Sequence, residues 1–210
     1  LQNQLQHAKT KAPAYTESLA DFTVDDLQSL ADISKLPVTR KSELITRQAA
    51  MRPFGGLTAI PDGELKYIFS SPGPIYEPQS MRADYWRFAR TLYAAGFRKD
   101  DIVHNCFSYH LTPAGAMAES GAHALGCAVI PAGVGQTELQ VQTISDLKPT
   151  AYIGTPSFLK IILEKADELG ADVSSINKAL VSGEAFPPST RDFLLQKGVQ
   201  ATQCFGTADL

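Results

Sequence analysis

The sequence predicts an α/β protein with a mostly parallel sheet and helices on both of its faces. From about residue 67 onward, short apolar runs with strand composition alternate with stretches in which apolar residues recur at helical spacing. Parallel neighbours need crossover connections, and the helices that make them cover the sheet. At 210 residues the chain can bury a sizeable core as one large or two small domains.

The first part of the chain has a different pattern. Its polar helical pieces are broken at Pro13, Pro37 and Pro53, because proline cannot continue a helix. We expect residues 1–60 to form a helical lead-in that wraps the core rather than an independent domain. The α/β domain is then expected over residues 61–210.

The first predicted strand covers residues 65–69, and a loop of sequence FSSPGPIYEPQ follows at residues 69–79. Ser80 is a suitable N-cap for a helix that Gly96 would end. The apolar residues of this helix recur at helical spacing and are Met81, Tyr85, Phe88, Ala89, Leu92 and Ala95.

Strands and helices then alternate to the end of the sequence. Pro156 suits the first turn of one of these helices, and Gly170 suits its end. The predicted strands are residues 102–107, 128–131, 151–154, 179–181 and 202–205. The predicted helices are residues 113–125, 138–147, 156–169 and 188–197. Because no helix follows the last strand, we expect the α/β domain to be incomplete at its C-terminus.

Composition describes an ordinary soluble globular protein. The net charge of −3 shows no basic surplus, so a nucleic-acid partner is not expected. The apolar stretches are shorter than the roughly 18 to 20 residues that span a bilayer, so neither a membrane partner nor a signal peptide is expected. A cytoplasmic location follows as the default. The three cysteines are widely spaced, which favours small buried hydrophobes over disulfides or a metal site.

Four motifs in a fixed order resemble a known family. They are SSPGP at residues 70–74, GCAVIPAGVGQTELQVQTISDLKPTAYIGTPSFL at 126–159, ALVSGEAFPPSTR at 179–191 and CFGTAD at 204–209. The chain resembles the amino-terminal domain of the phenylacetate-coenzyme A ligase group of adenylate-forming enzymes, a group that includes coenzyme F390 synthetases. The segment SLADISKLPVTRKSEL at residues 29–44 is similar to the lead-in of that family, so the resemblance covers nearly the whole chain.

The resemblance implies a reaction in two steps. A small-molecule carboxylic acid attacks the α-phosphate of ATP to give an acyl-adenylate, and coenzyme A then displaces AMP. ATP or AMP, Mg²⁺ and coenzyme A are the implied cofactors. Residues 61–210 would be the domain that binds nucleotide and acyl group. A carboxy-terminal domain with a catalytic lysine belongs to the family pattern, so we expect residues 1–210 alone to be inactive.

The segment that starts at Phe205 is similar to the family's aromatic-Gly-x-Ser/Thr-acid motif. The resemblance implies that Phe205 packs on adenine beside Gly206. It also implies that Thr207 contacts the α-phosphate as a catalytic residue, and that Asp209 is both catalytic and the metal ligand. One carboxylate is typical for Mg²⁺ that is bound to ATP. The alternative is a plain strand end and turn.

A second motif follows the strand predicted over residues 179–181. The resemblance implies that its backbone lines the adenine and the acyl pocket, and glycine permits a close approach to a ligand. The alternative is a strand-to-helix turn in which Glu184 is solvated. The residues of this motif are Ser182, Gly183, Glu184, Ala185 and Phe186.

Ser70, Ser71 and Gly73 stand where the family has its phosphate-binding loop. Backbone N–H groups and hydroxyls would surround the phosphates there. The two prolines within SSPGP remove two such donors, and Glu77 would repel a triphosphate. The loop therefore departs from the family pattern, which favours altered nucleotide handling.

The acyl pocket is the last implied site. Tyr109, His110, Gly115 and Phe158 correspond to family segments that shape it, with aromatic rings opposite small residues. The alternative for His110 is an ordinary loop histidine. Phe158 follows Thr155, which suits a helix N-cap.

The function we expect is that of an adenylate-forming acid–thiol ligase. Nucleotidyl transfer to another cofactor, as in F390 synthetases, would use the same adenosine site. Two rivals of other classes stay open: a non-catalytic protein that binds a nucleotide or acyl-adenylate, and a structural or oligomerising domain. A homodimer also stays open.

Overall fold

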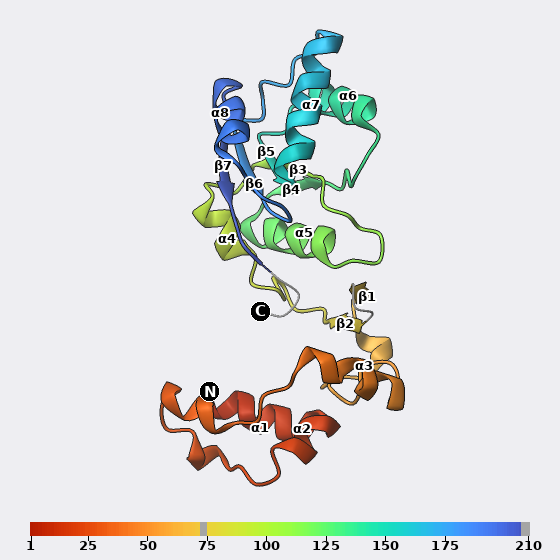
Figure 1. Cartoon of the computed structure of the whole chain (residues 1–210), viewed down its shortest axis with the longest axis vertical. Coiled ribbons are helices and arrows are strands. Elements are labelled where there is room, and N and C mark those ends of the chain that lie inside the picture. Colours follow the sequence, from red (N-terminus) through yellow and green to blue (C-terminus); the bar gives the residue numbers. More distant parts are fainter. Residues whose placement is uncertain (72–74, 207–210) are drawn as a thin grey trace. The chain divides into compact units, whose positions relative to one another are not determined.

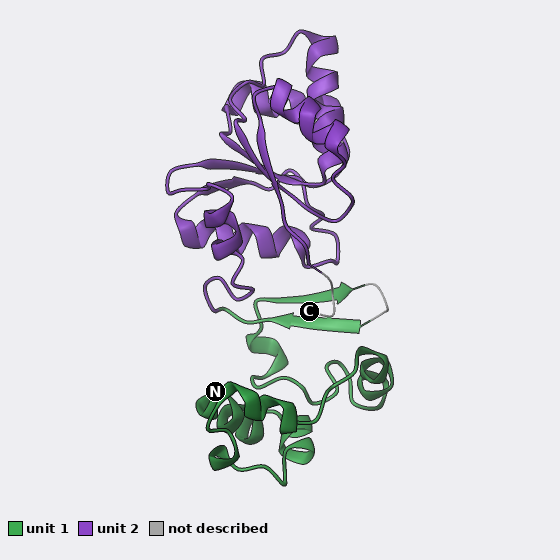
Figure 2. Ribbon diagram, turned by 60° about the vertical axis from the view of Figure 1, so that its left-hand side comes forward, with its two compact units in different colours: residues 1–81, 209 green, residues 82–208, 210 purple. Residues whose placement is uncertain are grey.

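A computed structural model describes residues 1–71 and 75–206 (Figure 1). Contacts divide the chain into two compact units (Figure 2). Unit 1 covers Leu1–Met81, and unit 2 covers the described residues from Arg82 onward. No helix in these described ranges has the length and apolar character that crossing a bilayer requires.

Unit 1 begins with short helices. Pro13 starts the second helix at its first turn, and the breaks expected at Pro37 and Pro53 both fall between helices. Leu5, Leu19 and Leu27 form a small core. The α-helices of unit 1 are α1 (Gln2–Lys11), α2 (Pro13–Ser18) and α3 (Lys41–Ala50). Its 3-10 helices are η1 (Val24–Asp26), η2 (Leu30–Lys35) and η3 (Asp62–Glu64).

A β-hairpin ends unit 1, where the sequence predicted one short strand and a loop. Strand β1 (Tyr67–Ser71) pairs antiparallel with β2 (Ile75–Gln79). The side chain of Gln48 in α3 holds β2, because its amide donates to Tyr76 O at 2.9 Å and accepts from Tyr76 N at 2.9 Å. The loop prediction for residues 69–79 was therefore wrong for 69–71 and 75–79, which form a ladder.

Unit 2 contains a five-stranded sheet in the order β4-β3-β5-β6-β7, and every neighbouring pair is parallel. The strands are β3 (Ile102–Asn105), β4 (Ala128–Ile130), β5 (Ala151–Gly154), β6 (Lys178–Val181) and β7 (Gln200–Gln203). The helices between them are α5 (Ala114–Leu125), α6 (Thr137–Leu147), α7 (Pro156–Leu169) and α8 (Pro188–Gln196), and α4 (Ala89–Ala94) precedes the sheet.

Helices cover both faces of this sheet, as predicted (Figure 1). The alternation along a strand decides which face each side chain joins: Tyr152 packs with α6, α7 and α8, whereas Ala151 and Ile153 pack with α4 and α5. Gly121 permits a close contact between α5 and α4, because a Cβ there would lie 2.9 Å from Ala89 N. The predicted fold class is confirmed.

One predicted helix is shorter than expected. The helix predicted to start at Ser80 begins only at Ala89. Asp84 and Arg87 have φ of 45° and 58°, which a right-handed helix does not allow. Asp84 Oδ1 instead accepts from Ala89 N at 3.1 Å and so satisfies the start of α4.

The strand order reverses beside β3. The chain passes from β3 to β4 on one side and then crosses over to β5 on the other. Ligands of open α/β sheets bind outside the carboxyl ends of the strands at such a reversal. The segments that follow β3 and β5, residues 106–109 and 155–158, are therefore placed for ligand contact.

An ion pair lies at the other end of the strands, at their amino ends. Lys178 Nζ lies 3.0 Å from both carboxylate oxygens of Asp101, and Thr150 Oγ1 donates to Asp101 Oδ1 at 2.7 Å. Burial alone would raise the pKa of Asp101, but hydrogen bonds from Arg98 N–H, Thr150 and Lys178 outweigh it and lower the pKa from 3.8. This cluster connects the starts of β3, β5 and β6.

Candidate functional site

The loop that follows β6 is joined to the segment that follows β7. Ser182 Oγ donates to Cys204 O at 2.9 Å, and Cys204 N donates to Val181 O at 3.0 Å. Gly183 has φ of 86°, a conformation that favours glycine, and is exposed. The structure thus brings together the two motifs that the sequence assigned to adenosine.

Glu184 has a partner that the sequence did not predict. Its Oε1 accepts from Ser157 N at 2.7 Å, so the carboxylate lies at the N-terminal end of α7, where negative charge is favoured. Gln203 Nε2 donates to Glu184 O at 3.3 Å. The side chain of Glu184 therefore connects the predicted nucleotide loop to the first turn of α7.

The other residues of this loop differ in exposure. Ala185 is exposed, whereas the ring of Phe186 is buried in the core beside α7 and α8. The guanidinium carbon of Arg191 lies 5.1 Å from the centre of that ring. Any contact of Phe186 with a ligand would thus involve its backbone more than its ring.

Phe205 is the most exposed large apolar residue of the candidate site, at 84%. Gly206 beside it has no neighbouring atom within 4 Å of where a Cβ would stand. An exposed ring next to open backbone can accept a flat base by stacking. Thr207 and Asp209, the predicted catalytic pair, lie outside the described residues.

The predicted acyl pocket gathers around Asn105, which the sequence reasoning missed. Asn105 Nδ2 donates to the Tyr109 hydroxyl at 2.8 Å and to Gly115 O at 2.9 Å. Gly115 N donates to Ser108 O at 3.0 Å. Tyr109 and Gly115 therefore lie together at the end of β3. The sequence offers no clear signal for this role, because the full burial of Asn105 is known only from the structure.

His110 and Phe158, the other two residues predicted for the acyl pocket, differ in exposure. His110 is exposed, and its backbone N donates to Ser108 Oγ at 3.1 Å. Phe158 is half-buried and packs on the core between α6, α7 and α8. Thr155 Oγ1 accepts from Phe158 N at 3.4 Å, which confirms the predicted cap, and Gly170 ends the helix as predicted.

Gly115 has no room for a side chain. A Cβ at this position would lie 2.8 Å from Ser108 O and 2.8 Å from Tyr109 Cδ2. We expect Gly115→Ala to displace the Tyr109 ring and to lower the free energy of unfolding by about 1–3 kcal/mol. Urea denaturation checks this, with Gly63→Ala as the control because Gly63 has open space. Equal stability of the Gly115 variant and the wild type would contradict this packing.

The predicted phosphate loop lies in unit 1. Ser70 and Ser71 are in β1 rather than in a loop, and Gly73 lies outside the described residues. Ser71 is buried, and its hydroxyl donates to Glu77 Oε2 at 2.5 Å. In this structure the hydroxyl of Ser71 is thus bonded to the carboxylate that the sequence expected to repel a triphosphate.

In the described part of the chain, no three His, Cys, Asp or Glu side chains are grouped so that they could hold a metal ion. Cys106, Cys127 and Cys204 are free; the first two are buried as predicted, whereas Cys204 is only half-buried. Burial raises the pKa of the Cys106 thiol to about 12 and raises that of Tyr152. Both side chains therefore stay neutral and are part of the hydrophobic core.

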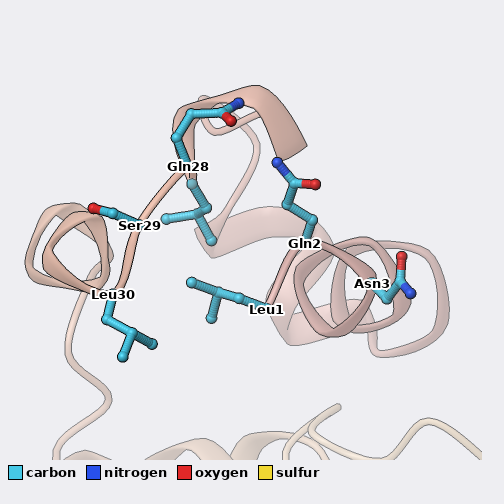
Figure 3. A pocket seen from close by; sticks show the side chains of 7 residues that line it. Leu1, Gln2, Asn3, Gln28, Ser29 and Leu30 are labelled. Atoms are coloured by element: carbon cyan, nitrogen blue, oxygen red, sulfur yellow. The ribbon is translucent and has the colours of Figure 1, made fainter.

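A hollow of about 580 Å³ lies in unit 1, and none of the residues that line it is a predicted site residue. Figure 3 shows the side chains around it, which come from the start of α1 and from residues 27–30. The side chains that line it include no acid, base or cation, so it is not a candidate for the predicted chemistry.

Comparison with known proteins decides the family. The family model described as AMP-binding enzyme matches residues 79–209. The chain belongs to the AMP-binding enzyme family. The match includes both motifs predicted for adenosine and the Asn105 cluster, and it confirms the resemblance found in the sequence.

Curated relatives extend the match to nearly the whole length of the chain. It is 31% identical to a phenylacetate-coenzyme A ligase of Aromatoleum evansii over 98% of the chain and 48% of that protein. It is 32% identical to phenylacetate-coenzyme A ligases of Pseudomonas putida and Escherichia coli strain K12, again over 98% of the chain. The chain thus spans about half the length of the curated relatives it matches.

A solved structure matches the chain at the level of the fold. It is an open conformation of 2-hydroxyisobutyryl-CoA ligase in complex with 2-HIB-AMP and CoA. The TM-score is 0.85 with 27% sequence identity, over 99% of this chain and 48% of that one. The predicted fold is therefore shared with an acyl-CoA ligase.

Proposed function

We propose that this chain is part of an acid–thiol ligase that activates a carboxylic acid with ATP and transfers the acyl group to coenzyme A. The observation that carries the proposal is the Ser182–Cys204 hydrogen bond, which joins the two adenosine motifs at the carboxyl edge of the sheet. The relatives named phenylacetate-coenzyme A ligase support the reaction and favour an aryl acid.

The residues have separate parts in this proposal. The exposed ring of Phe205 packs on adenine, and the backbone of residues 182–186 lines the base. Tyr109 lines the acid site, and the fully buried Asn105 holds the Tyr109 hydroxyl. Asp209, from its motif, would hold Mg²⁺, which neutralises phosphate charge in the adenylation step. Coenzyme A is the proposed thiol acceptor.

Acid-dependent exchange of pyrophosphate into ATP by the full-length protein tests this function. We expect exchange with an aryl acid such as phenylacetate and none without acid. Exchange requires a reversible adenylate, so it separates activation from thioester formation. AMP binding without any exchange would favour the non-catalytic binding protein instead.

The hydrogen bond between Ser71 and Glu77 favours a second candidate. A phosphate loop whose hydroxyl is bonded to a carboxylate suits altered nucleotide handling, as in nucleotidyl transfer to another cofactor. Nucleotidyl transfer to a cofactor acceptor without an added acid would favour this candidate. A cytoplasmic location, a homodimer and the absence of nucleic-acid and membrane partners stay predictions.

Residues 1–210 by themselves are expected to form no acyl-CoA, because they span 48% of the length of a relative with the proposed activity. Liquid chromatography of reactions with ATP, phenylacetate and coenzyme A checks this, with the full-length protein as the positive control. Acyl-CoA made by residues 1–210 would show that this half alone contains the catalytic groups.

A further inference from the structure

Gln140 of α6 is a buried amide with partners at both ends. Its Nε2 lies 3.3 Å from Ala132 O and 3.2 Å from both Gly133 O and Gly135 O. Backbone carbonyls only accept, so the NH₂ end must face them. The carbonyl oxygen of the amide must then face the sheet.

That oxygen meets two side chains of the sheet region. Gln140 Oε1 lies 2.5 Å from His104 Nε2 and 3.7 Å from Cys106 Sγ. Because Oε1 only accepts, His104 carries its proton on Nε2. Burial lowers the pKa of His104, against the opposing effect of its bond to Gln140, so the ring stays neutral. Gln140 therefore connects β3 to residues 132–135.

The backbone conformation of residues 132–135 allows their carbonyls to face the Gln140 amide. Gly133 and Gly135 have φ of 67° and 78°, which lets neighbouring carbonyls turn toward one point. Gly133 N also donates to Asn105 O at 2.9 Å. The segment is thus held from two sides, by Gln140 and by the end of β3.

Asn105 continues the connection into the candidate acid site. Its backbone carbonyl accepts from Gly133, while its side chain holds the Tyr109 hydroxyl and the Gly115 carbonyl. A continuous set of hydrogen bonds therefore runs from Gln140 through residues 132–135 to Tyr109. All of these residues belong to unit 2.

We propose that Gln140 is a positioning residue that keeps residues 132–135 against the carboxyl end of β3 and so sets Asn105 and Tyr109 for the acid. The acid-positioning part rests on the proposed function, whereas the holding of the segment does not. The two parts have separate readouts.

Hydrogen exchange of the full-length protein without substrates tests the holding of the segment. In Gln140→Leu we expect the amides of Ala132 and Gly133, which donate to Ile130 O and Asn105 O, to exchange about 10-fold faster, since the segment is held less firmly. The control is Gln142→Leu, because Gln142 lies on the exposed side of the same helix and donates to Asp146. Equal exchange in Gln140→Leu and wild type would overturn the proposal.

Pyrophosphate exchange with phenylacetate as the probe tests the positioning of the acid. We expect Gln140→Leu to raise the KM for the acid about 10-fold, the loss of roughly one hydrogen bond, while the KM for ATP stays within about twofold. Gln142→Leu should behave as wild type. A fall in kcat with both KM values unchanged would indicate a merely structural role and overturn the positioning role.

Gln140→Glu adds a readout for the case in which the leucine variant does not fold. A protonated carboxyl can donate and accept, whereas a carboxylate cannot donate to the three carbonyls. His104 and Cys106 face this position. Burial disfavours a carboxylate there, so we expect the KM for the acid and the exchange of Ala132 and Gly133 to be nearer wild type at about pH 6 than at about pH 8. Equal KM values and equal exchange rates at both pH values would contradict the proposed role of Gln140 in holding residues 132–135.

The outcomes separate the two hypotheses. A wild-type protein without acid-dependent exchange contradicts the proposed function and with it the acid-positioning role. The hydrogen-exchange rates still decide whether Gln140 holds the segment.

Discussion

Asp101→Ala is expected to lower the free energy of unfolding of unit 2 by about 3 kcal/mol, because it leaves a partly buried lysine without its carboxylate. The Asp101 side chain is only 10% exposed, and it accepts from Lys178, Thr150 and the backbone of Arg98. Urea denaturation followed by the fluorescence of Trp86, the single tryptophan, measures the loss in this unit.

Asp167→Ala is the matched control, since Asp167 pairs with Lys197 at 2.5 Å but is 60% exposed. An exposed pair contributes about 0–1 kcal/mol. Equal losses in the two variants would show that the burial of Asp101 has no energetic consequence.

The Asp101 cluster also predicts a pH dependence. Its pKa in the folded protein is below 3.8, so its contribution is present above the unfolded value and is lost as pH falls through the folded pKa. The stability difference between wild type and Asp101→Ala should therefore shrink below about pH 4. A difference that stays constant to lower pH would contradict the lowered pKa.

Asp209→Asn in the full-length protein is expected to lower acid-dependent pyrophosphate exchange by about 100-fold, the scale of losing one group that stabilises transition-state charge. The variant keeps the size of the side chain and removes the charge proposed to hold Mg²⁺. Excess Mg²⁺ should restore little activity, because the amide is a weaker ligand than the carboxylate.

Asp192→Asn is the control for this variant, since Asp192 is an exposed carboxylate on α8. Thermal denaturation should give equal midpoints for both variants and wild type. Wild-type exchange rates in Asp209→Asn would remove the metal role, and a lowered midpoint would point to a structural one.

Local sequence signals predicted the first and last residues of some elements correctly. Helix α7 begins and ends where the sequence placed it, because the Thr155 cap, Pro156 in the first turn and Gly170 at the end are all local. The helix expected from Ser80 failed because periodicity does not reveal left-handed residues, and Asp84 and Arg87 both have positive φ.

Motif spacing predicted the candidate site only in outline. It assigned Ser182 and Phe205 to one nucleotide site, and the hydrogen bond from Ser182 to Cys204 joins their two segments. Motif spacing could not show that the Glu184 carboxylate accepts a hydrogen bond from the first turn of α7, or that the Ser71 hydroxyl donates one to Glu77. Both contacts depend on how separate segments are packed or paired.

The sequence by itself determined the family, the alternation of strands and helices and the order of the motifs, since each depends on residues close together in the chain. Only the tertiary structure decided the partners of buried polar groups. Asn105 and Gln140 look unremarkable in a sequence, yet burial requires each of their polar atoms to find a partner, and those partners come from other segments.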